Sequence, residues 1–232
     1  MQKGTRIRIT AGGQEAGAYA AVPSPDLGRA PLSTPGVLVL HAWWGLGREI
    51  ESLCERFAAF GYAALAPDLY DGDIACDIGE ATARRNQLDP EGALVQAATA
   101  LSFLKHEMGL RIGRVGVCGL SLGGSMALRL AAARPRDVAA LATFYGLAAD
   151  VDVAQLPTPV VGHFAANDPF ASSEEVQVFE AALRRGGDVS AVHVYPGTGH
   201  WFFESDRPEA YEVEAAQLAW DRTLAFFDRV LP

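Results

Sequence analysis

Short, continuous apolar runs recur along most of this chain, bounded by glycine, proline or polar residues. Such runs are typical of strands buried on both faces of a sheet. They occupy residues 36–41, 62–66, 115–118, 138–145, 159–165 and 189–195. Stretches with helical periodicity lie between them. These occupy residues 49–60, 91–108, 172–185 and 208–230, with an alanine-rich helix after residue 123 and a short helix near 80–87, in a polar segment expected to form part of a pocket rim.

The first part of the chain has a different pattern. Residues 6–10 and 16–22 predict an N-terminal hairpin with its turn at Gly12 and Gly13, and the Pro/Ser/Gly-rich residues 23–35 predict a surface loop. Beyond it, strands alternate with helices, which predicts an α/β fold with a mainly parallel central sheet and helices on both faces. No repeat or linker interrupts the pattern, so residues 1–232 are expected to form a single domain.

Composition excludes several classes of protein. The net charge of −9 argues against binding to nucleic acid or to anionic membranes, since both need basic patches. Cys54, Cys76 and Cys118 are scattered, so neither a disulfide framework nor a zinc site is expected. The chain has no apolar run of about 18 residues and no signal-peptide pattern at its start. A cytoplasmic location, with no metal or organic cofactor, is the resulting expectation.

One segment carries a candidate nucleophile. The run containing Val115 and Val117 ends abruptly at Gly119-Leu120-Ser121-Leu122-Gly123, and a helical pattern follows. Strand, sharp turn and helix in this order are typical of a nucleophile elbow, whose serine takes strained backbone angles. The turn would lift the Ser121 hydroxyl to a helix N-terminus, where free amides favour a developing anion. The pentapeptide alone is a weak signal, so partners are needed.

The partners occur at the ends of later strands. Asp168 follows the run 159–165 and His200 follows the run 189–195. Carboxyl ends of parallel strands meet at one edge of a sheet, and the order serine, aspartate, histidine is that of an α/β-hydrolase. Histidine can accept the hydroxyl proton near pH 7, and aspartate fixes its tautomer.

The predicted oxyanion hole consists of two backbone amides, that of Leu122 and that of Trp43, which is preferred over Ala42. His41 is expected to support the turn that contains Trp43. Alternative interpretations stay open for each predicted catalytic residue. Ser121 could be a structural turn residue, Asp168 a loop Asx-turn, and His200 an ordinary loop histidine. The remaining histidines and Cys118 read as packed or solvated side chains.

The chain resembles the dienelactone hydrolase family over nearly its full length. The resemblance is carried by several blocks in order: His41-Ala42-Trp43-Trp44-Gly45-Leu46, Ala66-Pro67-Asp68-Leu69-Tyr70, the elbow ending in Gly123-Gly124, Phe144-Tyr145-Gly146, Asp168-Pro169-Phe170 and His200-Trp201-Phe202. It implies a single-domain α/β-hydrolase with a Cys–His–Asp triad that acts on esters or lactones.

Three positions depart from that family's pattern. Serine stands at 121, where the family usually has cysteine, and Ala42 replaces a glutamate thought to engage the resting thiol. These two changes are consistent with each other. A serine has no thiol that must switch between a resting and a reactive form, so the glutamate has no task. Glu204 stands where dienelactone-hydrolysing members carry an arginine for the substrate carboxylate, and it would repel that group. Arg84 or Arg85 could still bind a carboxylate, although solvated surface arginines are the simpler interpretation.

Aromatic side chains are expected to line an apolar substrate pocket beside the triad. The candidates are Trp43, Trp44, Tyr70, Tyr145, Phe170, Trp201 and Phe202. The sequence therefore predicts a serine carboxylic-ester hydrolase, monomer or homodimer, acting on small neutral esters through an acyl-enzyme on Ser121. Alternatives are a lactone hydrolase with a carboxylated substrate, a non-catalytic binding protein on the same fold, and acyl transfer or perhydrolysis by the same residues.

Overall fold

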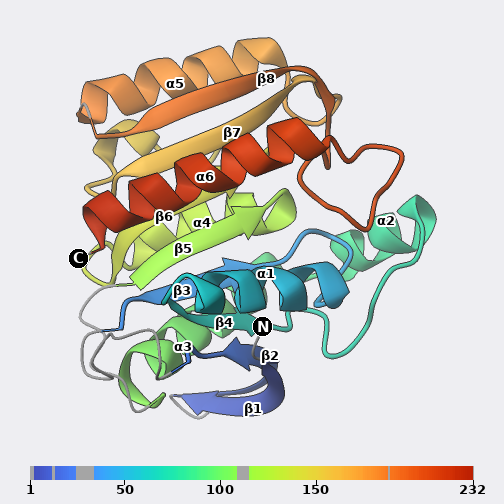
Figure 1. Cartoon of the computed structure of the whole chain (residues 1–232), viewed down its shortest axis with the longest axis vertical. Helices are drawn as coiled ribbons and strands as arrows, with labels where there is room; N and C mark the ends of the chain where they lie inside the picture. Colours follow the sequence, from blue (N-terminus) through green and yellow to red (C-terminus); the bar gives the residue numbers. More distant parts are fainter. Residues whose placement is uncertain (1–2, 12–13, 25–33, 109–114, 188, 232) are drawn as a thin grey trace. The chain divides into compact units, whose positions relative to one another are not determined.

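Eight strands and six α-helices alternate along the part of the chain that the computed structural model describes, residues 3–11, 14–24, 34–108, 115–187 and 189–231 (Figure 1). The predicted turn at Gly12 and Gly13 and most of the predicted loop 23–35 lie outside these residues. The chain divides into two compact units, residues 1–117 and 118–232.

The first unit is built on four strands in the order β1-β2-β4-β3. They are β1 (Thr5–Ala11), β2 (Gln14–Ala21), β3 (Gly36–Leu40) and β4 (Ala63–Pro67). The β1–β2 hairpin is antiparallel and pairs antiparallel to β4, whereas β3 and β4 run parallel. Every residue of β3 and β4 is buried, as their continuous apolar sequence predicts.

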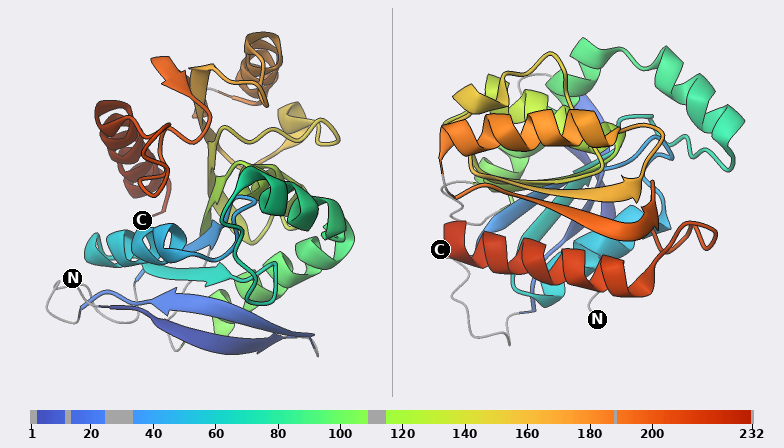
Figure 2. Two further views of the ribbon diagram at one scale, coloured as in Figure 1. Left: turned by 90° about the vertical axis from the view of Figure 1, so that its right-hand side faces the viewer. Right: turned by 90° about the horizontal axis from the view of Figure 1, so that it is seen from above.

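Helices cover both faces of these strands. Helix α1 (Arg48–Ala59) packs on β2, β3 and β4, and α3 (Pro90–His106) packs on the opposite face (Figures 1 and 2). The short α2 (Ile78–Gln87), capped by Asp77, lies in the segment predicted as irregular with a short helix.

The second unit begins within β5 (Val115–Leu120) and continues with β6 (Val138–Phe144), β7 (Val160–Asn167) and β8 (Ala191–Gly199). Strands β6, β7 and β8 are consecutive and parallel. Helix α6 (Val213–Val230) covers one face of this unit, and α4 (Leu122–Ala133) and α5 (Ser173–Gly186) cover the other (Figure 2). The predicted α/β class, with a mainly parallel sheet between helices, is confirmed.

Several element boundaries differ from the prediction, and three of them bear on the segments that lead to Asp168 and follow His200. Strand β8 continues through Pro196 and Gly197 to Gly199, although proline and glycine indicated that it ended at residue 195. Strand β7 similarly extends to Asn167, with a register shift that lets the two strands stay paired up to Gly199. Helix α6 begins at Val213 and not at residue 208, since residues 207–211 form backbone-bonded turns instead.

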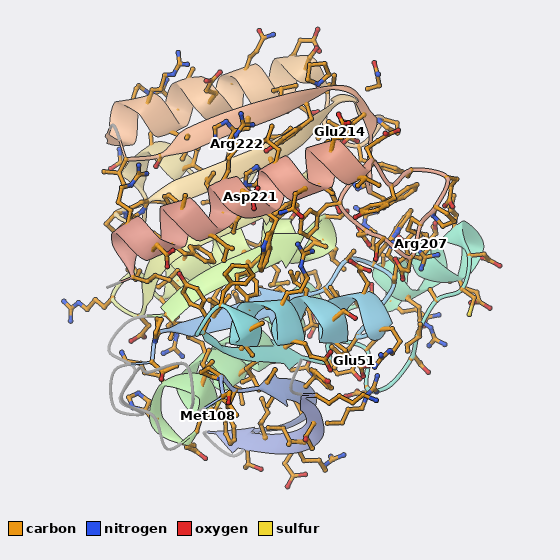
Figure 3. The ribbon with its side chains drawn as sticks, in the orientation of Figure 1. Glu51, Met108, Arg207, Glu214, Asp221 and Arg222 are labelled. Carbon is orange, nitrogen blue, oxygen red and sulfur yellow. The ribbon has the colours of Figure 1, made fainter. Side chains whose placement is uncertain are left out.

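A buried polar network joins β7, β8 and α6. The Thr223 hydroxyl donates to the Ala219 carbonyl, so it accepts from Nε2 of His163, which lies 3.0 Å away. His163 Nδ1 must then accept from the Tyr195 hydroxyl, 2.8 Å away. The guanidinium carbon of Arg222, a residue of α6 labelled in Figure 3, lies over the Tyr195 ring at 5.4 Å from its centroid. Burial lowers the pKa of His163 well below its ordinary value, so the imidazole is neutral. These bonds fix the two strands whose ends lead to Asp168 and His200.

Candidate active site

The turn after β5 has the geometry of a nucleophile elbow. Ser121 has φ 51° and ψ −111°, a strained combination for a residue with a side chain. Its amide donates to the Phe144 carbonyl at 2.8 Å, and its carbonyl accepts from the Ser125 amide. A methyl group at Gly119 would overlap the backbone of Gly123, so the turn requires glycine there. Main-chain contacts therefore hold the strained backbone of Ser121 in place.

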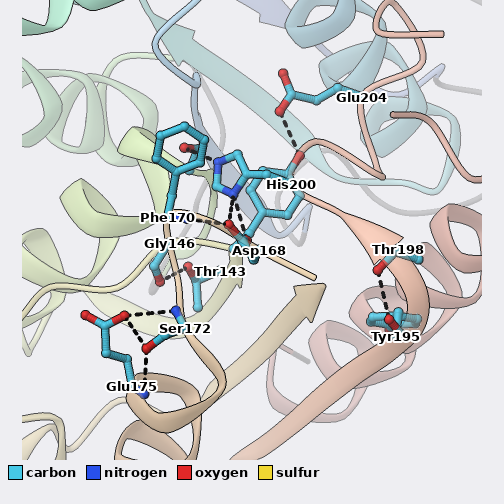
Figure 4. Close-up of polar contacts among 12 residues, drawn as sticks. Thr143, Gly146, Asp168, Phe170, Ser172, Glu175, Tyr195, Thr198, His200 and Glu204 are labelled. Carbon is cyan, nitrogen blue, oxygen red and sulfur yellow. Dashed lines mark hydrogen bonds and ion pairs between the residues drawn. The ribbon is translucent and has the colours of Figure 1, made fainter. Parts of the chain in front are cut away.

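The loops after β7 and β8 bring Asp168 and His200 to the elbow. His200 Nε2 lies 2.9 Å from the Ser121 hydroxyl oxygen, and Nδ1 lies 2.7 Å from Asp168 Oδ2 (Figure 4). A carboxylate can only accept, so the proton lies on Nδ1, and the unprotonated Nε2 faces the hydroxyl. Asp168 also accepts from the Phe170 amide at 2.8 Å. The three predicted side chains form one connected chain of hydrogen bonds.

The Asp168 and His200 side chains are shielded from water, whereas Ser121 is half-buried. The Asp168 side chain is fully buried and that of His200 is 4% exposed. Rings of Tyr145, Phe170 and Trp201 lie 4.6, 4.9 and 5.2 Å from the imidazole centroid. A low-dielectric setting strengthens the hydrogen bond between the carboxylate and the imidazole.

Two helix-end features favour negative charge beside Ser121. Leu122 is the first residue of α4, so its amide is one of the four that have no acceptor within the helix. The N-terminus of α4 carries a partial positive charge, and no side chain caps it.

In the first unit, His41 holds the turn that contains Trp43. The Leu69 amide donates to His41 Nε2 at 3.1 Å, so Nδ1 carries the proton and donates to the Ala42 carbonyl at 2.6 Å. The Gly45 amide donates to the same carbonyl. The Ala42 carbonyl oxygen thus accepts two hydrogen bonds. In a trans peptide the N–H of Trp43 points in the direction opposite to that carbonyl. Burial lowers the pKa of His41, which keeps the ring neutral in this role.

The other predicted pocket aromatics lie in different environments. Trp44 packs edge-on against Trp43. Tyr70 packs on His41 and borders a cleft of about 500 Å³ formed with the ends of α2 and α3. Arg84, also on that cleft, forms an ion pair with Asp73. Phe202 is fully buried between Tyr145 and Tyr195.

One contact at this site has no counterpart in the sequence analysis. Glu204 is 2% exposed and accepts a 2.7 Å hydrogen bond from the Tyr145 hydroxyl. The sequence marks Glu204 only as a departure from a family pattern. The two residues are far apart in the chain, and no spacing rule connects them.

Within the ranges described, no group of histidine, cysteine, aspartate and glutamate is arranged to hold a metal ion. No helix found there is both long and apolar enough to cross a membrane.

A nucleophile elbow followed by aspartate and histidine at successive strand ends defines an α/β-hydrolase. The dienelactone hydrolase family model matches residues 18–231. Protein usf of Aquifex pyrophilus is 34% identical over 208 residues, covering 85% of this chain and 89% of that protein. A protein of Aquifex aeolicus assigned as a carboxymethylenebutenolidase is 31% identical over the same shares of the two chains.

Solved structures agree with the sequence relatives. The crystal structure of a protein assigned as a dienelactone hydrolase from Klebsiella pneumoniae has a TM-score of 0.85 and 26% identity, and the match covers 97% of this chain and 98% of that one. The chain belongs to the dienelactone hydrolase family. It is a carboxylic ester hydrolase.

Proposed function

We propose that this chain hydrolyses small neutral esters through an acyl-enzyme on Ser121. The observation that carries the proposal is the position of His200, whose Nε2 lies 2.9 Å from the Ser121 hydroxyl while Nδ1 is bonded to Asp168. A serine hydroxyl does not ionise at neutral pH, so it becomes a nucleophile only with a base at this distance.

The proposed reaction has two halves. Ser121 Oγ attacks the ester carbonyl carbon while its proton passes to His200 Nε2. The tetrahedral intermediate collapses, the bond to the leaving oxygen breaks, and that oxygen takes the proton from Nε2. Water then attacks the acyl-serine ester, giving a proton to Nε2. The second intermediate releases the carboxylic acid, and the proton returns to Ser121. Asp168 holds the imidazole in the required tautomer throughout.

The Leu122 amide is the proposed oxyanion donor next to Ser121, and the Trp43 amide remains the second donor that the sequence predicts. Support for Leu122 is its place as the first residue of α4, where the amide has no acceptor within the helix. Support for Trp43 is His41, which orients the Ala42–Trp43 peptide. Loss of one oxyanion donor costs about 10²–10³-fold in rate in a well-studied enzyme. The aromatic residues beside His200 are the proposed walls of the substrate pocket.

The preference for neutral substrates is argued from charge. Glu204 is buried close to the catalytic histidine loop, and Ala42 supplies no charge. An anionic substrate would enter a region that already holds the carboxylates of Asp168 and Glu204. A lactone with its own carboxylate is the second candidate, because a relative is assigned as a carboxymethylenebutenolidase. A cytoplasmic location remains a prediction, which cell fractionation tests. A monomeric or dimeric state is also a prediction, which light scattering tests.

Replacing the nucleophile tests the proposal directly. Ser121→Ala should reduce p-nitrophenyl acetate turnover to the background rate, because no hydroxyl remains to form the acyl-enzyme. The melting temperature should change little, since main-chain contacts hold the turn. Ser125→Ala, on the same helix, is the control and should retain activity. Turnover by Ser121→Ala equal to that of the wild type would refute the assignment.

The substrate class needs a separate comparison. Neutral short-chain esters and a carboxylated lactone should be assayed at equal concentration with the wild type. A higher kcat/KM for the neutral esters is the expected result. Preference for the carboxylated lactone would favour the second candidate. Failure of every substrate to react, together with no labelling by a fluorophosphonate, would favour a binding protein.

A further inference from the structure

A buried hydrogen bond connects the elbow to the loop that carries His200. Glu204 lies in a series of turns that begins at Gly199, in which the Glu204 amide donates to the Trp201 carbonyl. Its carboxylate accepts from the Tyr145 hydroxyl at 2.7 Å, and both side chains are buried. A buried carboxylate without such a donor would be strongly destabilising, so the bond fixes where the glutamate lies (Figure 4).

The other end of Tyr145 is fixed by the backbone. Tyr145 has φ 42°, and its amide donates to the His163 carbonyl of β7 at 2.7 Å. The next residue, Gly146, lies so close to Ser121 and Gly124 that a methyl group there would overlap their backbones. The Tyr145 ring therefore starts from a position set by the elbow and ends at Glu204.

Between these two ends the Tyr145 ring contacts the catalytic imidazole. The ring centroids are 4.6 Å apart with an interplanar angle of 57°. Hydrogen bonds to Asp168 and Ser121 engage Nδ1 and Nε2, but both bonds lie near the plane of the imidazole and resist rotation of the ring out of that plane only weakly. A second ring in contact with the imidazole restricts that rotation. The Nε2 lone pair then stays directed at the Ser121 hydroxyl.

We propose that Glu204 is a positioning residue, which acts through the Tyr145 hydroxyl to hold the Tyr145 ring against His200. The inference rests on the proposed role of Ser121 and His200. In this role Glu204 acts by accepting a hydrogen bond from Tyr145. The sequence suggested a different role, in which the charge of Glu204 repels anionic substrates, and the two roles are independent.

The test uses variants that separate hydrogen bonding from charge. Tyr145→Phe keeps the ring and removes the donor, and Glu204→Ala removes the acceptor. Glu204→Gln removes the charge but keeps an acceptor oxygen. Matched controls are Tyr211→Phe and Glu209→Ala, at a half-exposed and an exposed position of the same unit.

Kinetics on p-nitrophenyl acetate give the first readout. Tyr145→Phe and Glu204→Ala should each lower kcat about tenfold and change KM by less than about twofold. This loss in kcat is smaller than the roughly 10²-fold cost of displacing a catalytic group by about 1 Å. The double variant should fall no further than either single one, because both remove the same bond. Glu204→Gln should retain most of the wild-type kcat. A Glu204→Gln kcat as low as that of Glu204→Ala, or an unchanged kcat in Tyr145→Phe, would overturn the proposal.

A proton NMR measurement gives a readout that does not depend on turnover. The low-field resonance of the proton between His200 Nδ1 and Asp168 should broaden or disappear in Tyr145→Phe, because the imidazole is free to tilt. It should persist in Tyr211→Phe. If the wild type hydrolyses no ester, this comparison still decides the inference, and an unchanged resonance in Tyr145→Phe rejects it. Tyr145→Phe loses only one oxygen, so it provides the test even if Glu204→Ala does not fold.

Discussion

At the residue scale, Asp168 serves two partners at once. Its Oδ1 accepts from the Phe170 amide, while both oxygens lie within 2.9 Å of His200 Nδ1. The main-chain bond fixes the rotation of the carboxylate, and the carboxylate fixes the imidazole. This is why the orientation of the base depends on a short loop and not on the imidazole alone.

The consequence is a prediction for Asp168→Asn. An asparagine keeps the volume but presents an N–H to Nδ1, which favours the tautomer protonated at Nε2. That nitrogen can no longer accept the Ser121 proton, and kcat should fall by about 10⁴-fold, as for the equivalent change in a serine protease. Ester hydrolysis and a melting curve check it. The control is Asp221→Asn, at an exposed position on α6, which should leave kcat unchanged. A kcat of Asp168→Asn close to that of the wild type would contradict the role assigned to Asp168.

At the scale of elements, α5 begins with a reciprocal cap. The Ser172 side chain accepts from the Glu175 amide, and the Glu175 carboxylate accepts from the Ser172 amide (Figure 4). Ser172→Ala removes one half of this exchange and should lower the free energy of unfolding by about 1 kcal/mol. Urea denaturation measures it. Ser173→Ala, one residue further on, should change the unfolding midpoint much less, and equal effects would argue against the cap.

Sequence patterns locate most elements but misplace some ends. The elbow is predictable because its glycines, strand and helix are local, and Asp168 and His200 follow because parallel strands end at one edge. The continuation of β8 through Pro196 is not predictable, since local turn signals conflict with pairing to β7. The Tyr145–Glu204 bond depends on tertiary packing alone, so no sequence rule could indicate it.

At the scale of the whole molecule, two fully buried histidines connect stability to pH. Burial lowers the pKa of both His41 and His163 in the folded state, whereas both titrate near 6.5 when unfolded. The unfolded chain therefore binds more protons between these values. The stability these neutral rings contribute is complete above about pH 6.5 and is lost as the pH falls through that region.

Below about pH 6.5 the free energy of unfolding should thus fall by about 1.4 kcal/mol per pH unit for each of these histidines. Urea denaturation between pH 8 and pH 5 gives the slope. His163→Gln can still accept from Tyr195 and donate to Thr223 without titrating, so its slope should be shallower. His106→Gln, on the exposed face of α3, should follow the wild type. A flat wild-type profile would contradict the prediction.

The left-handed backbone at residue 121 has an evolutionary consequence. The contacts that impose it, from Phe144, Ser125 and the Gly119–Gly123 approach, all involve main-chain atoms, and none uses the side-chain oxygen. Sulfur and oxygen are thus exchangeable at this position without rebuilding the turn. A single codon change interconverts serine and cysteine, so the backbone of this turn does not oppose a change between alcohol and thiol chemistry.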